Sequence, residues 1–377
     1  MKQHYPLSRF LTEYNQKNEG NKYDPVAVGK YGIRTRESIY SKELANDYSK
    51  NKLIYKNTLT VGMGSNQIDI GILTEDTIYS VSPAYHTYRI DAINAEYLRY
   101  CLECLNQDMF TRYVKRGCRQ GKTIDLKRWL TYEIPVVNVA EQKKIVEKID
   151  WVSKLIEKRQ EQLIQLNILL KSRFIELFGT YPGNEKGWNT ENIRDVVSEV
   201  RYGSSRPAVD GGQYPYLRMN NITYEGELDL SDTKRIDIPD NELEKCTVRR
   251  GDVLFNRTNS KELVGKTCVY NRDEMMVLAG FVIRVRVNEK VLPEFLSAFL
   301  NTDFSKKMLL GMCKTAIGQA NINAQELQNI GLYIPPINLQ QEFVDFKTQI
   351  DKSKLAVQQS LQELETLKKS LMQQYFG

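Results

Sequence analysis

Histidine is nearly absent from this 377-residue chain, which contains only His4 and His86. Because histidine supplies many metal ligands and general bases, its scarcity argues against histidine-rich metal sites and most histidine-dependent catalysis. No apolar run reaches the eighteen or so residues of a membrane span, and the polar residues after Met1 predict that there is no signal peptide. The six cysteines have no disulfide-like spacing, which predicts a cytoplasmic location, and Cys101 and Cys104 are expected to be buried in a helix.

Motifs of nucleotide sites and enzymes are also missing. A phosphate-binding loop needs a glycine five residues before its Gly-Lys-Ser/Thr. Arg116 holds that position before Gly121-Lys122-Thr123, and Ser260 holds it before Gly265-Lys266-Thr267. The sequence has no serine-hydrolase elbow, zinc-protease motif, dinucleotide fingerprint or amino-methyltransferase signature. We therefore predict no catalytic residue and no metal site.

The sequence does contain a repeat of itself. Three pairs of segments match in the same order at offsets of 198 to 200 residues: 96–102 with 294–300, 134–139 with 334–339, and 163–179 with 361–377. A fixed offset is the signature of duplication. The chain is predicted to consist of two units of roughly 200 residues, each a globular part followed by a helix.

Each repeat is predicted to end in a long helix. Asn138 with Glu141, and Asn338 with Gln341, have the spacing of a capping box, and the first helix meets no further proline until Pro182. Apolar residues recur every seven positions in both helices, which predicts a coiled-coil seam. Two seams of equal length favour packing of the helices on each other, although each could lie on its own domain. The predicted seam residues are Ile149, Ile156, Leu163, Leu170, Phe343, Ile350, Val357, Leu364 and Leu371.

The remaining sequence predicts two globular parts of mixed α and β structure. We expect the first part at 1–137 and the second at 180–337, with the long helices at 138–179 and 338–377. In each part, strand-like runs precede a predicted helix. The expected strands are 52–60, 67–73 and 78–90 in the first part and 214–219, 247–256, 267–271 and 276–287 in the second, and the expected helices are 94–114 and 293–310.

Positive charge is concentrated in one segment, 111–130, whose net charge of +6 equals that of the whole chain. We expect this segment to be a helix exit and a loop. Arginine and the side-chain amides can read base edges, whereas lysine and serine suit phosphates. A solvated charged loop explains any one cluster, but several such loops in one domain favour nucleic acid. The candidate DNA-binding residues are Arg112, Lys115, Arg116, Arg119, Gln120 and Lys122 in the first part, and Ser204, Arg206, Arg218, Asn220, Arg257, Asn259 and Lys314 in the second.

The sequence resembles the specificity subunits of Type I restriction-modification systems. The resemblance is carried by the duplicated Ile-Pro-x-x-Asn motif, by the helix ends LLKSRFIELFG and LKKSLMQQYFG, and by YPYLRMNNIT, GELDLSD, GDVLFNRTNSKELVGKT and GQANIN in the second part. It implies an α+β fold with an internal pseudo-twofold repeat. Two target recognition domains, each reading half of a split DNA site, would be separated by two long helices in an antiparallel coiled coil. The first part lacks the Gly-Asp-Val found at 251–253.

The resemblance also implies partners. These are double-stranded DNA and two adenine methyltransferase subunits, with or without two motor-nuclease subunits. S-adenosylmethionine, ATP and Mg²⁺ would then be bound by the partner subunits, and this chain would be a non-catalytic part of a bacterial defence complex. Two other hypotheses remain open: a stand-alone DNA-binding regulator, and a coiled-coil adaptor that does not bind DNA.

Overall fold

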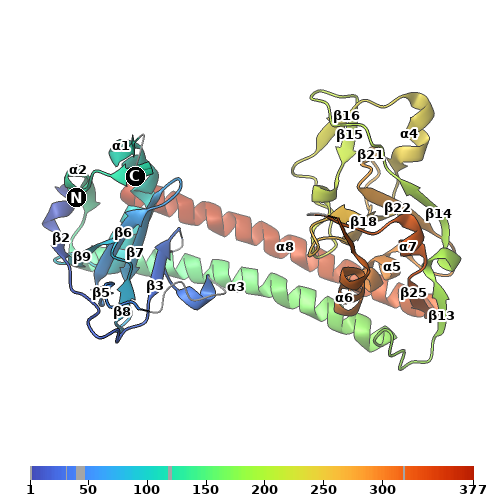
Figure 1. Ribbon diagram of the computed structural model, residues 1–377, viewed down its shortest axis with the longest axis horizontal. Coiled ribbons are helices and arrows are strands. Elements are labelled where there is room, and N and C mark those ends of the chain that lie inside the picture. Colours follow the sequence, from blue (N-terminus) through green and yellow to red (C-terminus); the bar gives the residue numbers. More distant parts are fainter. Residues whose placement is uncertain (1, 31, 40–46, 118–120, 317–318) are drawn as a thin grey trace. The chain divides into compact units, whose positions relative to one another are not determined.

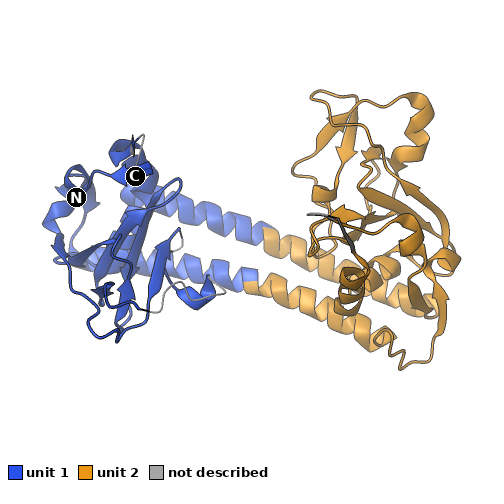
Figure 2. Ribbon diagram, viewed as in Figure 1, with its two compact units in different colours: residues 1–160, 359–377 blue, residues 161–358 orange. Residues whose placement is uncertain are grey.

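The computed structural model describes residues 2–30, 32–39, 47–117, 121–316 and 319–377. The chain forms two compact units (Figure 2), one of Met1–Gln160 with Gln359–Gly377 and the other of Glu161–Gln358. We call these unit 1 and unit 2. No helix in the described part of the chain combines the length and the low polarity needed to cross a membrane.

Unit 1 contains a four-stranded antiparallel sheet (Figure 1). Its strand order is β2 (Leu11–Tyr14), β9 (His86–Ile90), β6 (Thr58–Met63) and β7 (Ile68–Leu73). The helix α1 (Ala95–Tyr113) packs on this sheet, because its apolar residues share one hydrophobic core with those of the strands.

Shorter elements complete unit 1. They are the pairs β1 (Gln3–Pro6) with β12 (Glu133–Val136), β3 (Val26–Gly29) with β4 (Gly32–Thr35), β5 (Lys52–Ile54) with β8 (Tyr79–Val81), and β10 (Val114–Gly117) with β11 (Gly121–Ile124), and the short helix α2 (Leu126–Trp129). An isolated bridge between Pro25 and Ser80 joins the end of β3 to β8.

Unit 2 contains a second four-stranded antiparallel sheet with the order β14 (Val197–Tyr202), β22 (Val282–Val287), β18 (Val253–Asn256) and β20 (Thr267–Val269). A mixed sheet has the order β16 (Lys234–Ile236), β15 (Tyr214–Leu217), β21 (Met276–Leu278) and β17 (Thr247–Val248), and a three-stranded sheet has the order β19 (Thr258–Asn259), β24 (Gln319–Asn321) and β23 (Lys314–Ala316). The strand β13 (Asn189–Asn192) pairs with β25 (Gly331–Ile334). The helices between these strands are α4 (Asp240–Cys246), α5 (Pro293–Leu300), α6 (Asp303–Met312) and α7 (Ala324–Gln328).

The two main sheets have the same topology, which confirms the predicted duplication. In both, the strand that comes first in the chain pairs with the last, the last pairs with the second, and the second pairs with the third. The elements after the sheets also correspond. The helix α1 is matched by α5 and α6, the hairpin β10–β11 by β23–β24, α2 by α7, and β12 by β25.

The long helices are α3 (Val139–Phe178) and α8 (Ile337–Phe376). In unit 1 the start of α3 packs on the end of α8, where Lys148 Nζ lies 3.5 Å from the Tyr375 hydroxyl. In unit 2 the end of α3 packs on the start of α8, with the ring centroids of Phe174 and Phe343 5.3 Å apart. The helical segments in each unit therefore run antiparallel, a direction that the heptads alone do not give. All nine predicted seam residues are buried or half-buried.

The helix ends agree only partly with the prediction. Asn138 caps α3, since its Oδ1 accepts a hydrogen bond from Glu141 N at 2.9 Å. The predicted cap at Asn338 is wrong, because α8 begins at Ile337 and Asn338 therefore lies inside the helix. The Pro336 carbonyl accepts the first helical bond from Leu339 N at 3.0 Å. The predicted helix 293–310 is also interrupted, because Thr302 caps the new helix α6 by accepting from Ser305 N.

Several predicted strands are in fact two strands joined by a turn. The run 52–60 divides into β5 and β6 at Asn57, which has a left-handed φ of 62°. The run 247–256 divides into β17 and β18 at Gly251, with φ 90°. The runs 78–90 and 276–287 each contain two strands as well. These turns are local reversals within apolar sequence, so alternation alone did not reveal them.

Candidate nucleic-acid interface

The basic segment of unit 1 begins at the exit of helix α1, as predicted, but the predicted loop contains the paired strands β10 and β11. Strands β10 and β11 pair directly after α1, with Lys115 opposite Thr123 and Arg116 opposite Lys122. Gly121 has a φ of 71°, a conformation that glycine adopts readily and that lets the chain re-enter the second strand. The hairpin projects basic side chains from the end of a buried helix.

Two of the candidate cations of unit 1 are paired with acids, and a third rests against the protein. The exposed Arg112 bonds to Asp108 at 2.9 Å, and Lys115 bonds to Asp125 at 2.7 Å. The Lys115 ammonium lowers the pKa of Asp125. Lys122 contacts the backbone carbonyl of Ser65 and lies 5.5 Å from the ring centroid of Phe110. Arg119, Gln120 and the side chain of Arg116 lie outside the described residues.

In unit 2, Arg206 and Arg218 are also neutralised by acids. Arg206 binds Glu242 through two nitrogens, at 2.7 and 3.2 Å, and Arg218 Nη2 lies 2.9 Å from Asp232 Oδ2. The pKa of Glu242 is lowered by its hydrogen bond with Arg206. Ser204 is buried, and its hydroxyl accepts a hydrogen bond from Arg206 N. These contacts hold the loop after β14 and the loop after β15 to their own unit.

The remaining candidates of unit 2 gather on another sheet. Strand β19 carries Asn259 and pairs with β24, so that Thr258 faces Asn321 and Asn259 faces Ala320. Arg257 immediately precedes β19. Lys314 lies on the next strand, opposite Asn321, but its side chain lies outside the described residues. Asn220 is exposed in the short helical turn after β15, apart from this sheet in the topology.

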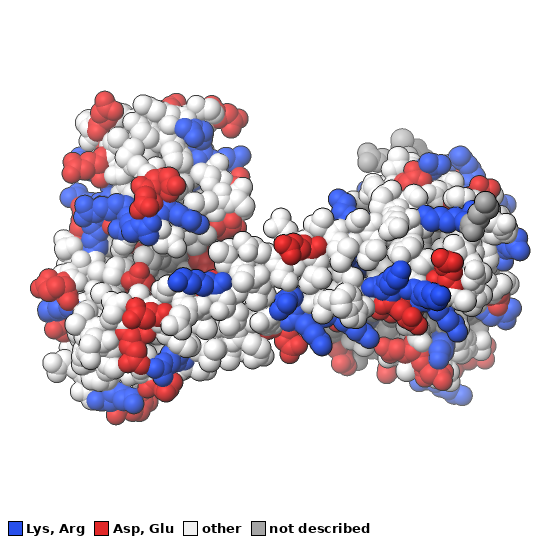
Figure 3. All heavy atoms as spheres, turned by 180° about the vertical axis from the view of Figure 1, so that it is seen from behind, with Lys and Arg blue, Asp and Glu red and all other residues white. Residues whose placement is uncertain are grey.

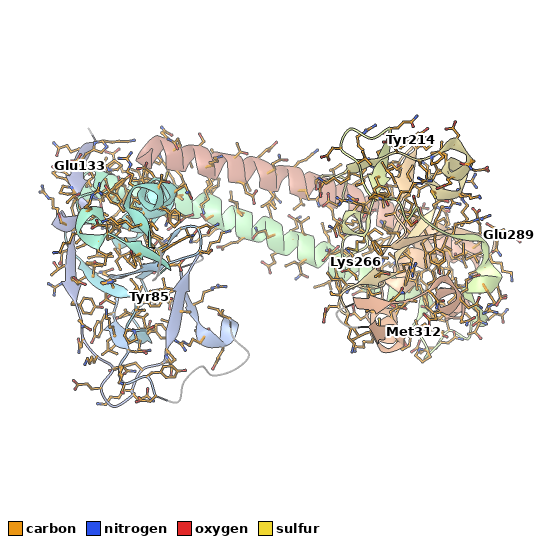
Figure 4. The ribbon with its side chains drawn as sticks, turned by 45° about the horizontal axis from the view of Figure 1, so that its top comes forward. Tyr85, Glu133, Tyr214, Lys266, Glu289 and Met312 are labelled. Carbon is orange, nitrogen blue, oxygen red and sulfur yellow. The ribbon has the colours of Figure 1, made fainter. Side chains whose placement is uncertain are left out.

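Two motifs of unit 2 have structural roles. Lys266, labelled in Figure 4, is buried, and its ammonium donates to the backbone carbonyls of Met219 and Ile222. Asp252 is buried as well, and it bonds to Arg286 at 2.8 Å and to Arg249 N at 2.9 Å. Lys266 thus anchors the turn that presents Asn220, and Asp252 ties the start of β18 to β22.

The distribution of charge does not by itself mark an interface. Figure 3 shows Lys and Arg side chains interspersed with Asp and Glu on both units, without one continuous basic surface on the face in view. Whether a cation forms an ion pair with a nearby acid is therefore a better guide to a DNA contact than the number of cations on a surface. The predicted set omits three residues beside Arg257: Tyr202 and Phe281, whose exposed fractions are 42% and 53%, and Asn321. Only the tertiary fold brings Tyr202 and Asn321 to Arg257, because they lie 55 and 64 residues away in the sequence.

The described residues contain no cluster of histidine, cysteine and acidic side chains that could hold a metal ion. Unit 2 has a cavity of about 520 Å³ lined mainly by apolar groups, among them Phe174, Tyr181, Tyr224 and Phe304. Lys306 also lines it, and its buried Nζ has no hydrogen-bond partner within the described structure. Burial lowers the pKa of Lys306 to about 8. None of the candidate DNA-binding residues lines this cavity.

Comparison with known proteins gives consistent similarities. The family described as "Type I restriction modification DNA specificity domain" matches residues 9–167 and 185–366. The chain is 28% identical over 227 residues to the Type I restriction enzyme EcoKI specificity subunit of Escherichia coli K12, an alignment that covers 56% of this chain and 49% of that protein. It is 24% identical over 193 residues to the putative MjaX specificity subunit of Methanocaldococcus jannaschii, covering 50% and 45%. The chain thus spans about half the length of these relatives.

Two solved structures have the same fold. A Type I restriction-modification S subunit from M. genitalium superposes with a TM-score of 0.55 at 12% identity, covering 100% of this chain and 96% of that one. A chain from a structure of the type I R-M system superposes with a TM-score of 0.58 at 17% identity, covering 99% and 97%. At these identities the superpositions show the fold alone.

Proposed function

Because the chain belongs to the Type I restriction-modification DNA specificity family, we propose that it reads a bipartite DNA site and holds the enzymes that act there. We place one target recognition domain at 1–137 and the other at 180–337, with spacer helices at 138–179 and 338–377. The chain itself would perform no chemistry. It would act in the cytoplasm, where a bacterial genome is accessible.

The observation that carries this proposal is the duplicated topology. Each repeat has its own main sheet, its own hairpin after the helix that follows that sheet, and its own long helix. Two structurally equivalent readers of different sequence suit a site made of two different short blocks. Phosphate contacts would fix each reader on the duplex, and contacts to base edges would select the sequence.

The partners follow from the family and from the repeat. Two adenine methyltransferase subunits, one for each repeat, would bind S-adenosylmethionine and transfer the methyl group. Two motor-nuclease subunits would add cleavage dependent on ATP and Mg²⁺ where the system has them. The absence of methyltransferase and phosphate-loop motifs from the sequence is consistent with this division of labour.

In unit 1, we assign Arg112, Lys115, Arg116, Arg119 and Lys122 mainly to phosphates, and we keep Gln120 as a candidate DNA-binding residue. Asp108 and Asp125 would then exchange their cations with DNA. Loss of one phosphate contact lowers the salt dependence of binding by about one unit without changing which sequence is preferred. Lys122→Ala is expected to behave in this way in the assembled complex, whereas Lys144→Ala, an exposed lysine of α3, should leave the salt dependence unchanged.

The decisive experiment compares the purified chain with the chain assembled on the methyltransferase of its own system. We expect methylated adenines only with the assembled complex, within two specific blocks separated by unread base pairs. Methyl transfer by the rigorously purified chain would refute the proposal. Sequence-specific binding that is unchanged by the methyltransferase would indicate a stand-alone regulator, and failure of the basic segments to cross-link to DNA would indicate an adaptor.

A further inference from the structure

The backbone of Arg257 is fixed on both sides. Its N–H donates to the Phe281 carbonyl at 3.0 Å, and its own carbonyl accepts from Ile322 N at 2.9 Å. The first bond ties it to the turn before β22, and the second ties it to the residue after β24. Arg257 therefore occupies a defined position where three segments of unit 2 meet.

Its side chain is held as firmly, and only by neutral groups. The guanidinium carbon lies 4.7 Å from the ring centroid of Tyr202, and Nε donates to Asn321 Oδ1 at 3.3 Å. The Tyr202 hydroxyl accepts from Ala324 N at 2.8 Å, which fixes the ring. Asn321 Oδ1 also accepts from the hydroxyl of Thr258, which fixes the amide. The cation therefore rests on supports that are themselves restrained.

The contrast with the other candidate arginines of unit 2 is clear. Arg206 and Arg218 each bind a carboxylate. Arg257 forms no ion pair with any residue that the structure describes, and its Nη1 makes only a long 3.5 Å contact with the Gly280 carbonyl. Because Nε is already occupied by Asn321, the two terminal nitrogens are the part of the fork that remains for a ligand. A restrained guanidinium loses little conformational entropy on binding and suits a pair of acceptor atoms.

We propose that Arg257 makes a principal DNA contact of unit 2, with Tyr202 and Asn321 as its positioning residues. This inference rests on the proposed function and sharpens it, because it ranks Arg257 above Arg206 and Arg218, whose carboxylate partners would first have to be exchanged for DNA. The ligand is a pair of acceptor atoms on the duplex. Two sources provide such a pair: the O6 and N7 edge of a guanine, and the oxygens of a phosphate. The exposed ring of Tyr202 borders the contact.

The test uses the full chain assembled with its methyltransferase, and it measures binding to the recognised site at several salt concentrations. Arg257→Ala is expected to weaken specific binding by about tenfold or more. The matched control is Arg272→Ala, an exposed arginine of the same unit, which should bind like the unmodified protein. Arg206→Ala and Arg218→Ala, which remove arginines already paired with carboxylates, should weaken binding less than Arg257→Ala does.

Two readouts separate the sources. If Arg257 binds a guanine, Arg257→Ala loses discrimination at one base pair, and 7-deazaguanine there weakens the unmodified complex but not the variant. If it binds a phosphate, all sequences weaken equally and the salt dependence falls by about one unit. Tyr202→Leu keeps the charge of Arg257 but removes the ring that supports it. This variant should show the same loss of base discrimination or of salt dependence as Arg257→Ala, to a smaller extent and at unchanged folding stability.

The outcomes also separate this inference from the proposed function. Failure of the unmodified complex to recognise any DNA sequence would refute the proposed function. If that complex binds specifically but Arg257→Ala matches Arg272→Ala, only the role of Arg257 is refuted. Should Arg257→Ala fold poorly, Arg257→Lys retains the charge without the planar fork, and scanning the unmodified complex with 7-deazaguanine and with methylphosphonate backbones detects either contact directly. If no position within the half-site of unit 2 were sensitive to these replacements, the inference would be refuted.

Discussion

Gln142 and Gln340 are buried amides at equivalent positions in the first turns of α3 and α8, 198 residues apart. Gln142 Oε1 accepts from Asn94 N at 2.8 Å, and its Nε2 donates to the Val137 carbonyl at 2.8 Å. Gln340 repeats this arrangement with Leu292 N and the Pro335 carbonyl, also at 2.8 Å. Asn94 and Leu292 occupy the N-cap positions of α1 and α5. One glutamine in each repeat thus joins the start of the long helix to the start of the helix before it.

Replacing either glutamine by leucine should lower the free energy of unfolding by about 1–3 kcal/mol, because buried main-chain groups lose their partners. Gln349→Leu, at an exposed position of α8, is the control and should change stability by no more than about 0.5 kcal/mol. Urea unfolding measures all three. Equal stabilities for Gln142→Leu and Gln349→Leu would show that the buried amide contributes nothing.

Lys306 should make stability depend on pH in the alkaline range. Its folded pKa of about 8, lowered by burial and then by Lys171 and Lys266, with Glu225 opposing, lies below the ordinary value of 10.5. Between these values the unfolded chain binds more protons, so this residue makes stability rise as pH increases from about 8 to 10.5. The free energy of unfolding of the unmodified protein should therefore rise across that range relative to that of Lys306→Met. Lys307→Met, at an exposed position, keeps Lys306 and should follow the unmodified protein. A parallel course for all three proteins would contradict the assignment.

At the scale of elements, the end of each long helix contributes to a hydrophobic core. The helix α8 ends in the core of unit 1, and α3 ends in the core of unit 2. Phe376, at the end of α8, packs on Tyr97 of α1 in unit 1 with ring centroids 5.1 Å apart. Phe178, at the end of α3, packs on Phe295 of α5 in unit 2 at 5.0 Å. Both pairs are edge-to-face, and the two pairs correspond at the offset of the repeat, since Phe376 and Phe178, like Phe295 and Tyr97, lie 198 residues apart. The last turn of the chain is therefore part of the core of the first globular part.

Truncation of these rings should destabilise one unit selectively. Phe376→Ala is expected to cost about 3–5 kcal/mol and to reduce hydrogen-exchange protection in α1, because it leaves a cavity in the core of unit 1. Phe178→Ala should have the corresponding effect in α5. Gln373→Ala, on an exposed face of the last turn of α8, serves as the control. If Phe376→Ala reduced hydrogen-exchange protection in α5 and left α1 unaffected, the packing described would be wrong.

The long helices, the burial of their heptad residues and the repeat were predictable because each follows from a regular spacing in the sequence. The hairpin β10–β11 was not, because its short strands are charged and carry no apolar alternation. The pairing of the arginines was equally hidden. Arg206 meets Glu242 36 residues away, and Arg257 meets Asn321 64 residues away, so the tertiary fold alone decides which cation is neutralised and which is not.

At the scale of the whole molecule, the repeat defines two units of the same topology, each completed by a segment of both long helices. Their surfaces differ where recognition is proposed. In unit 2, Arg257 directly follows β18, whereas Gly64 directly follows β6, the corresponding strand of unit 1. If each unit reads its own block, the two blocks should differ in sequence and should be separable by exchange of one globular part.

The most direct test of this account replaces residues 188–333 with the second domain of another family member and leaves α3 and α8 in place. Methylated adenines are then mapped across the genome of cells that carry the exchanged chain with its methyltransferase, beside cells that carry the unmodified chain. We predict that one block of the recognised site changes, while the other block and the number of base pairs between them stay the same. A change in both blocks together, or in neither, would contradict the claim that each repeat is an independent reader.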